Sequence, residues 1–399
     1  MDFENTAIGF GYKTDKELKK AGQLFSIMRF SWLVKPGISL TLFALKWKLP
    51  VKNLIRNTLF KQFVGGENLP ATDGTLQLLL LHKVNAILDY GAEGKDHEDS
   101  FRMACKEFLN LISHAATKQN IPFISIKVTG LGRFELLEKI NSKVYRTESG
   151  IQMNLGTLTT AERQEWHELV KRIELICRSA ASHHIGILID AEESWIQNTI
   201  NGLTEKMMRK YNTDKAIVYN TIQFYTKYGY PFLVDSINDA HKAGYVLGVK
   251  IVRGAYMEKE RERAARLNYP CPIQLNKNAT DTDFNRGLRY CFENISTVAL
   301  IIASHNEQSN LQALQLLEEF GLERGHPHIH FSQLYGMSDN ITFNLAKSGY
   351  SVSKYLPYGP ISEVVPYLMR RAQENTSVAG QTSRELLLIS RELKRRKDF

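Results

Sequence analysis

The sequence has few cysteines and lacks the common signatures of metal, nucleotide and hydrolase sites. Its four cysteines form no C-x-x-C pair, which argues against a zinc site and favours reduced thiols in a reducing compartment. No Walker A, H-E-x-x-H or G-x-S-x-G motif occurs. His326, His328 and His330 alternate along one predicted strand, a pattern that fits pleated packing better than metal geometry. We therefore expect no metal.

No apolar run is long enough to cross a membrane. The most apolar early stretch, from Leu24 to Leu49, is interrupted by Arg29, Lys35 and Lys46, so it lacks the roughly 18 uncharged residues that a spanning helix needs. It could lie on a membrane surface or pack as a helix against the main domain. The first residues lack a secretory signal and are too acidic for a transit peptide. We expect a cytoplasmic protein and leave open a peripheral contact with the cytoplasmic face of the inner membrane.

The charge balance does not by itself identify a partner. The chain is 43% hydrophobic with a net charge of +9, so it is not of the disordered class and could meet nucleic acid, anionic lipid or acidic ligands. The one dense basic run lies between Arg391 and Lys397, where a solvated helix end is the simplest interpretation. No recognition motif or interleaving of aromatic and basic residues is present, so we expect no nucleic acid partner.

Short β-rich runs alternate with long helical segments over about 300 residues. Eight strands are predicted at 86–90, 123–128, 186–190, 216–220, 247–252, 298–303, 328–332 and 350–355. Helices are predicted between them, for example at 98–119, 160–182, 308–319 and 340–347. This alternation predicts an α/β fold, a (β/α)₈ TIM barrel, with a doubly wound open sheet as the alternative.

Three regions are expected. Residues 1–80 form a helical N-terminal region, residues 81–380 form the barrel catalytic domain, and residues 381–399 form a basic C-terminal helix or tail. In a barrel of this kind the chemistry sits at the carboxyl ends of the strands, so polar residues at those ends are candidates. They are Lys127, Asp190, Gln223, Lys250, Arg253, Ser304, His305, Asn306, Gln333 and Lys354.

The segment after the eighth strand carries the strongest local signal. Tyr367, Arg370, Arg371 and Glu374 stand at i, i+3, i+4 and i+7 of a predicted helix and so share one face. Pro366 is expected in the first turn, which would place this face near the rim of the barrel. Two guanidinium groups can grip one small carboxylate. A solvated surface helix with the same spacing is the alternative.

Several motifs, in order along the chain, closely resemble those of the proline dehydrogenase (proline oxidase) family. They are IDAEESW, VYNTIQFY, GVKIVRGAYMEKER, ASHN, FSQLYGM, SKYLPYG and PYLMRRAQEN, spanning about Asp190 to Asn375, with weaker similarity back to about residue 60. The length resembles the single-function branch, without an aldehyde dehydrogenase module. The resemblance implies a distorted barrel with noncovalent FAD. It implies oxidation of L-proline to Δ1-pyrroline-5-carboxylate by hydride transfer to flavin N5, the first step of proline catabolism to glutamate, with electrons passed to a quinone.

The resemblance also assigns residues. It places Asp190, Lys250 and Lys127 in catalytic roles. Substrate contacts are implied for Lys127, Asp190, Ala255, Tyr256, Leu334, Tyr355, Tyr367, Arg370 and Arg371. FAD contacts are implied for Ala191, Gln223, Lys250, Val252, Arg253, Gly254, Ala255, Ser304, His305, Asn306, Gln333 and Glu374. Many bacterial members have arginine in place of Lys250 and tryptophan in place of Met257.

Three alternatives stay open. Hydroxyproline is the close rival substrate, and Tyr355 favours proline, because in the family a small residue at that position goes with hydroxyproline. A nucleic-acid-binding protein and a catalytically inactive barrel used for interaction are the alternatives from other classes. Purified protein that is yellow and bleaches with proline would separate the enzyme from both.

Overall fold

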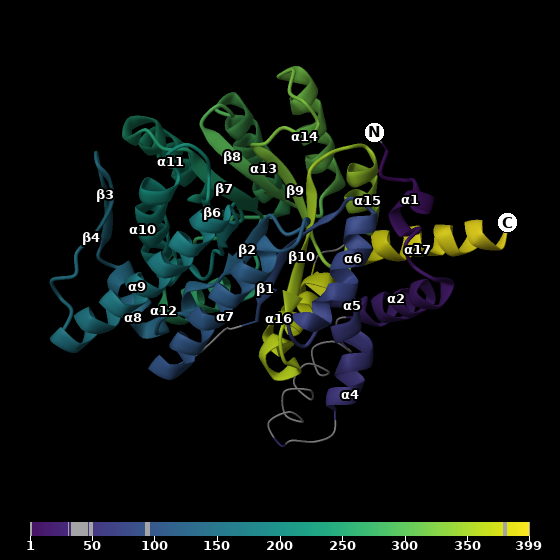
Figure 1. Ribbon diagram of the computed structural model, residues 1–399, viewed down its shortest axis with the longest axis horizontal. Coiled ribbons are helices and arrows are strands. Elements are labelled where there is room, and N and C mark those ends of the chain that lie inside the picture. Colours follow the sequence, from purple (N-terminus) through teal and green to yellow (C-terminus); the bar gives the residue numbers. More distant parts are fainter. Residues whose placement is uncertain are drawn as a thin grey trace. The chain divides into compact units, whose positions relative to one another are not determined.

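The computed structural model describes residues 2–30, 32, 47, 51–91, 96–377 and 381–398, and the side chains of 373–377 and 381 lie outside this description. Eight parallel strands form a closed barrel in which each strand lies beside its neighbours in the chain (Figure 1). They are β1 (Asn85–Tyr90), β2 (Phe123–Ile126), β5 (Gly186–Ile189), β6 (Val218–Gln223), β7 (Leu247–Val252), β8 (Val298–Ala303), β9 (Ile329–Leu334) and β10 (Val352–Tyr358). The predicted (β/α)₈ barrel is confirmed.

A helix follows each strand. The principal ones are α7 (Glu98–Ala116), α9 (Thr160–His183), α10 (Ser194–Tyr211), α11 (Gly229–Ala243), α13 (Lys277–Glu293), α14 (Glu307–Glu319), α15 (Asp339–Lys347) and α16 (Ile361–Ser377). Polar side chains cap the first turn of two of these helices. Thr159 and Glu162 form a capping box at the start of α9, and the Asn306 side chain accepts from the Ser309 amide at the start of α14. Each of these contacts satisfies a backbone donor that the first turn leaves open.

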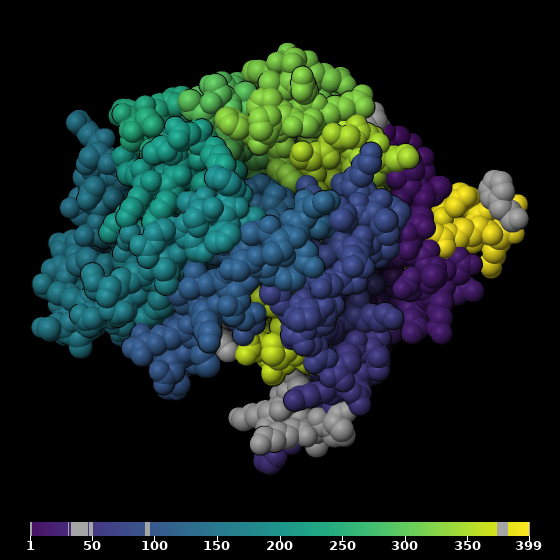
Figure 2. All heavy atoms as spheres, viewed as in Figure 1, coloured from purple at the N-terminus to yellow at the C-terminus, as the bar shows by residue number. Residues whose placement is uncertain are grey.

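The chain divides into two compact units, residues 92–330 and residues 1–91 with 331–399. In the 92–330 unit, the β-rich runs are almost wholly buried, as in β5 and β8. This unit also contains α8 (Phe134–Asn141), α12 (Met257–Leu267), a short 3₁₀ turn η3 (Val128–Gly130), and a hairpin of β3 (Val144–Thr147) and β4 (Gly150–Met153). The hairpin stands out at the left edge of the space-filling view (Figure 2).

The other unit contains the two ends of the described chain. Its remaining elements are α1 (Thr6–Phe10), α2 (Asp15–Met28), α4 (Lys52–Ile55), η1 (Arg56–Phe60), α5 (Lys61–Phe63), η2 (Pro70–Thr72), α6 (Asp73–Leu81) and α17 (Gln381–Lys397). Apolar side chains of α2, η1, α5, α16 and α17 form one buried cluster. Within the described ranges, no helix is long and apolar enough to cross a membrane. The division into 1–80, 81–380 and 381–399 stays a prediction.

The structure corrects several local details. Val128, predicted to end the second strand, belongs to the 3₁₀ turn η3. The strand β9 extends to Leu334, so Gln333 and Leu334 lie within it. Pro366 was predicted in the first turn of its helix, but α16 begins at Ile361, directly after Pro360, and Pro366 lies inside it. The hairpin β3–β4 was not predicted.

Candidate active site

Four polar side chains lie at one level of four neighbouring strands. Ile126 pairs with Ile189 and Ile189 with Asn220, so the next residues, Lys127, Asp190 and Thr221, are level with one another. Thr221 in turn pairs with Lys250. Paired residues of parallel strands point to the same face of a sheet. The barrel therefore brings these groups, which lie far apart in sequence, close together.

Asp190 is the centre of this group. Its Oδ1 lies 2.5 Å from Nζ of Lys250, and its Oδ2 lies 3.0 Å from Nζ of Lys127. The Ser125 hydroxyl donates to Oδ1 at 2.7 Å, and its side chain is fully buried. The sequence placed Lys127, Asp190 and Lys250 at strand ends but gave no signal for the contacts of Asp190 with Lys250 and Ser125. We call Lys127, Asp190 and Lys250 the lysine–aspartate cluster.

The charges of this cluster decide its chemistry. Burial raises the pKa of Asp190, but Lys250 and then Lys127 lower it more strongly, so the pKa of Asp190 lies below its ordinary value. Asp190 is therefore ionised at neutral pH and a poor proton acceptor. With both lysines protonated, the three groups carry a net charge of +1 in a buried setting, which suits negative charge that develops on a bound group.

The segment after β5 connects the cluster to two neighbouring strands. The Glu192 side chain accepts from the Thr129 amide at 3.2 Å and from its hydroxyl at 2.5 Å. Its backbone carbonyl accepts from Nε2 of Gln223 at 2.8 Å. Burial raises the pKa of Glu192 to about 7, and the Thr129 contact opposes this shift. Gln223, a predicted FAD contact, is thus fixed at the end of β6.

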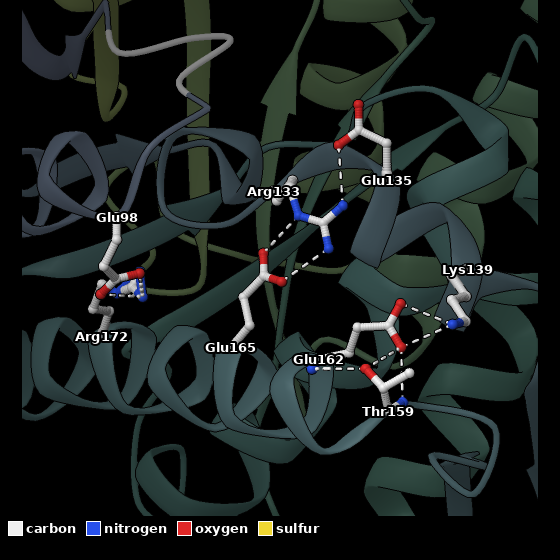
Figure 3. A network of polar contacts seen from close by, with 8 residues as sticks. All are labelled: Glu98, Arg133, Glu135, Lys139, Thr159, Glu162, Glu165 and Arg172. Atoms are coloured by element: carbon white, nitrogen blue, oxygen red, sulfur yellow. Dashed lines mark hydrogen bonds and ion pairs between the residues drawn. The ribbon is translucent and has the colours of Figure 1, made fainter.

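The segment that follows Lys127 is also fixed from outside the barrel. The buried Arg172 of α9 donates from Nη1 to the Leu131 carbonyl at 2.7 Å and pairs through Nη2 with Glu98 of α7 at 2.8 Å. Figure 3 shows this pair together with two contacts that join α9 to α8 and to the residue before it: the bidentate contact of Arg133, which directly precedes α8, with Glu165, and the Lys139–Glu162 pair. These contacts hold α8 and the end of β2 against the helix layer.

A further cation, Arg253, directly follows β7. Arg253 donates to the Ser304 hydroxyl at 2.8 Å and to the Ser309 hydroxyl at 2.9 Å, and its Nε lies 2.7 Å from Asp281. Its guanidinium lies 4.4 Å from the centre of the Phe284 ring. Arg253 and Ser304 were both predicted to bind FAD, and the structure brings them into contact. His305 and Asn306 follow on the segment that leads into α14.

The turn after Arg253 depends on glycine. Gly254 has a φ of +135°, and a Cβ there would lie 2.4 Å from the Tyr225 ring, so only glycine fits this position. The residues that follow, Ala255 and Tyr256, are partly and mostly buried. Val252 and Ala191, predicted as FAD contacts, are partly exposed at the ends of their strands.

The remaining predicted residues belong to the other unit. Leu334 and Tyr355 are paired across β9 and β10, and both are partly buried. On α16, the guanidinium of Arg371 is buried and lies 5.1 Å from the centre of the Tyr367 ring, and Arg370 is partly exposed. Gln333 accepts from the Thr342 hydroxyl at 2.8 Å. The Glu374 side chain lies outside the described residues.

This unit also contains a buried charge cluster that the sequence did not reveal. Asp339, at the start of α15, lies 2.8 Å from Nζ of Lys354 on β10 and 2.9 Å from Nζ of Lys13. Nζ of Lys354 also donates to the Met337 carbonyl at 2.5 Å. Glu385 of α17 accepts from the Ser338 amide. These contacts hold the segment that directly follows Leu334.

The comparisons of this chain with known proteins agree on one family. A family model described as proline dehydrogenase matches residues 74–384. Hydroxyproline dehydrogenase of Xenopus laevis is 31% identical over 97% of this chain and 88% of its own length. Mitochondrial proline dehydrogenase 1 of Dictyostelium discoideum is 33% identical over 87% of this chain and 66% of its own. The human counterpart is 39% identical over 61% of this chain.

The solved structures extend the similarity to the fold. Proline utilization A (PutA) from Bdellovibrio bacteriovorus, inactivated by N-propargylglycine, matches with a TM-score of 0.71 at 19% identity, over 93% of this chain. At that identity the likeness concerns the fold. This chain spans 38% of that PutA chain and 41% of the human relative.

Proposed function

This chain belongs to the proline dehydrogenase family, and we propose that it oxidises L-proline to Δ1-pyrroline-5-carboxylate with bound FAD, as the first step of proline catabolism to glutamate. The observation that carries the proposal is the buried lysine–aspartate cluster with its net positive charge. A group that accepts a hydride becomes more negative, and fixed positive charge nearby stabilises it.

The residues present are suited to a flavin. The Thr221 hydroxyl lies level with Lys250, is buried, and has no hydrogen-bond partner among the residues that the structure describes. Arg253, held between two serine hydroxyls, supplies the permanent cation that a pyrophosphate requires. The residues that would hold FAD are Ala191, Gln223, Lys250, Val252, Arg253, Gly254, Ala255, Ser304, His305, Asn306, Gln333 and Glu374.

The protein's part in the reaction is to bind, orient and stabilise. Bound FAD would supply the hydride acceptor, its N5 atom. By the family resemblance, Arg370 and Arg371 would bind the proline carboxylate, and contacts with the proline ring are implied for Tyr355, Tyr367, Leu334, Ala255 and Tyr256. Lys250 stabilises the negative charge that forms, and Asp190 keeps both lysines in place. Because the pKa of Asp190 is held low, it serves as an electrostatic partner, and the neutral amine of proline provides its own electron pair.

A product assay tests this proposal. The purified protein, supplied with FAD, L-proline and an artificial electron acceptor, should release Δ1-pyrroline-5-carboxylate, which o-aminobenzaldehyde traps as a coloured adduct. D-proline serves as the control, because its carboxylate is placed on the opposite side of the ring. Reduction of the acceptor at equal rates with both enantiomers, or with neither, would contradict the proposal.

Hydroxyproline is the second candidate substrate, and the Xenopus hydroxyproline dehydrogenase gives it a specific basis. Tyr355, beside Leu334 on the paired strands β10 and β9, favours proline by bulk, because an added ring hydroxyl would need space and a polar partner. The ratio of kcat/KM for L-proline and trans-4-hydroxy-L-proline decides between them.

We extend the proposal to a quinone as electron acceptor and to a peripheral contact with an anionic membrane. Between residues 18 and 66 the chain has nine lysines and arginines and no acidic residue. Ile27, Phe30, Trp32 and Leu54 within it are exposed, Trp32 by 70%. Exposed tryptophan beside lysine and arginine is typical of interfacial anchors.

The basic run from Arg391 to Lys397 is expected to contribute little to this contact. Arg396 pairs with Asp15 and Glu392, and Arg391 pairs with Glu4. Two arginines of this run are therefore already paired with carboxylates of the protein itself. Binding to vesicles that contain phosphatidylglycerol should fall at high salt and in the Trp32→Ala variant, while removal of residues 394–399 should change it little. Salt-independent binding would contradict the electrostatic contact.

A further inference from the structure

Glu192 lies two residues beyond Asp190, and none of the roles assigned above uses its side chain. It is 4% exposed. Both of its carboxylate oxygens accept from a single residue, Thr129, one from the amide and one from the hydroxyl. A buried carboxylate is costly unless its lone pairs are satisfied. Two contacts directed at one residue fix the distance between the segments that follow β5 and β2.

Thr129 is rigidly connected to Lys127. The Gly130 amide donates to the Lys127 carbonyl at 3.1 Å, and the Leu131 amide donates to the Val128 carbonyl at 2.9 Å. These are the hydrogen bonds of the short 3₁₀ turn η3. A displacement of Thr129 therefore moves the turn that begins at Lys127, whose ammonium lies 3.0 Å from Asp190.

The backbone of Glu192 connects it to a third strand. Its carbonyl accepts from Nε2 of Gln223 at 2.8 Å, and its amide donates to Oε1 of Gln197 on α10 at 2.8 Å. Gln197 donates in turn to Asn201, which also accepts from Asn220 of β6. One residue thus joins the ends of β2, β5 and β6, the strands that present Lys127, Asp190 and Gln223.

We propose that Glu192 is a positioning residue for proline oxidation: its ionised carboxylate, tied to Thr129, holds Lys127 and Gln223 in register with Asp190. This inference rests on the proposed function and deepens it. Both hydrogen bonds from Thr129 require lone pairs on Glu192, so protonation of Glu192 replaces one acceptor with a donor and loosens the contact.

The surroundings of Glu192 give this contact a pH dependence. Burial and the neighbouring Glu193 favour the protonated form, while Thr129 and the ammonium of Lys127 favour the ionised form, and the pKa of Glu192 is about 7. Lys259 of α12 pairs with Glu193 at 3.0 Å, which limits the effect of that neighbour. Activity should therefore fall as the pH drops through about 7.

Two variants at this position separate positioning from packing. Glu192→Gln keeps the size, accepts from the Thr129 amide through its oxygen, donates to the hydroxyl through its nitrogen, and does not titrate. Glu192→Ala removes both contacts. The matched control is Glu260→Gln. Glu260 is also fully buried and accepts from the amide and hydroxyl of one residue, Ser194, at 2.6 and 2.7 Å.

The experiment is a pH profile of kcat/KM for L-proline on the FAD-loaded proteins between pH 5.5 and 9. Because proline must lose its own ammonium proton, kcat/KM should rise with pH in all of these proteins. The natural protein and Glu260→Gln should show an additional loss below about pH 7, and Glu192→Gln should lack this additional limb. Glu192→Ala should lose about ten- to a hundredfold in kcat/KM, since small misplacements of catalytic groups cost that much, and Glu192→Gln should recover most of it.

Two results would overturn the inference. One is an unchanged limb in Glu192→Gln, and the other is a Glu192→Ala variant with natural kcat/KM at pH 8. If Glu192→Ala fails to fold, the pH profile of Glu192→Gln alone still decides. Failure of the proposed function looks different, because the natural protein itself would then show no proline-dependent reduction of FAD.

Discussion

Nζ of Lys250 lies 2.5 Å from Oδ1 of Asp190, inside the barrel and away from solvent. Lys250 comes from β7 and Asp190 follows β5, and the second oxygen of Asp190 contacts Lys127. One carboxylate therefore holds two ammonium groups that would otherwise repel each other. This arrangement fixes the ammonium of Lys250, which we propose lies beside bound FAD, in one place inside the barrel.

The first prediction concerns Asp190→Asn, which removes the charge and keeps the shape. Two buried ammonium groups would then lie side by side without a carboxylate. Breaking a buried ion pair typically costs about 3–5 kcal/mol of unfolding free energy. We expect a large drop in Tm and a loss of proline oxidation of at least about a hundredfold, measured by thermal unfolding and steady-state kinetics.

Glu319→Gln is the control for this loss. Glu319 pairs with Arg289 at 2.8 Å, but both side chains are about half exposed, and exposed pairs contribute roughly 0–1 kcal/mol. The control should therefore unfold and turn over like the natural protein. Equal effects of the two substitutions would mean that burial of the lysine–aspartate cluster has no energetic consequence.

The second prediction concerns the two arginines of α16. Arg370→Met or Arg371→Met should lower kcat/KM for L-proline by roughly 10² to 10⁴, since each charged hydrogen bond contributes about 1.5–3 kcal/mol. Pyrrolidine lacks the carboxylate, so its slow oxidation should be unaffected by either substitution. Arg289→Met, at an exposed position on α13, is the control. If the loss were the same for proline and pyrrolidine, the arginines would not bind the carboxylate.

The third prediction is a pH dependence of stability. Burial and then Asp339 raise the pKa of Glu385 to about 7, above its ordinary value of 4.5. The folded protein therefore keeps a proton that the unfolded chain releases, and this stabilisation is lost as the pH rises from about 4.5 to 7. Glu385→Gln cannot titrate, so its stability relative to the natural protein should improve by up to about 3 kcal/mol between pH 5 and pH 8.

Chemical unfolding of both proteins at the two pH values measures this difference. Glu392→Gln provides the control, because arginine partners lower the pKa of Glu392 to about 2. Glu392 therefore stays ionised from pH 5 to pH 8, and the stability difference between Glu392→Gln and the natural protein should hardly change over this range. A constant difference between Glu385→Gln and the natural protein across this range would show that Glu385 is not protonated in the folded state.

The fourth prediction concerns Gly254, where a side chain would meet the Tyr225 ring and a positive φ. Gly254→Ala should weaken FAD binding and lower stability by about 1–3 kcal/mol. Gly74→Ala is the control. Gly74 lies in α6 with open space around it, so alanine there should be neutral or stabilising by about 0.4–1 kcal/mol. Differential scanning fluorimetry with and without FAD compares the two variants.

The sequence was sufficient to predict the strands of the barrel but not the contacts between their side chains. The eight strands could be predicted because short apolar runs alternate with helices, and β7 and β8 have the predicted ends. The contact of Lys250 with Asp190 could not, because it depends on the register between β5, β6 and β7, which barrel closure sets. Glu192 and Glu193 are adjacent, and nothing local shows which carboxylate will meet Thr129.

Other features were missed for equally physical reasons. The hairpin β3–β4 is a short excursion between α8 and α9, and its Arg146 reaches Asp239 of α11, a contact with no sequence signal. Pro366 was expected in the first turn of its helix, but α16 already begins at Ile361, so the proline lies inside the helix. The substrate and FAD contacts were assigned to residues from a family resemblance, and these roles stay predictions.

The central claim is that the lysine–aspartate cluster lies beside a flavin that proline reduces, and an anaerobic absorption spectrum tests it most directly. The purified protein should show flavin bands near 450 nm that bleach on addition of L-proline, with Asp190→Asn bleaching at least about a hundredfold more slowly. A colourless protein that takes up no added FAD, or flavin bands that L-proline leaves unchanged, would contradict the account.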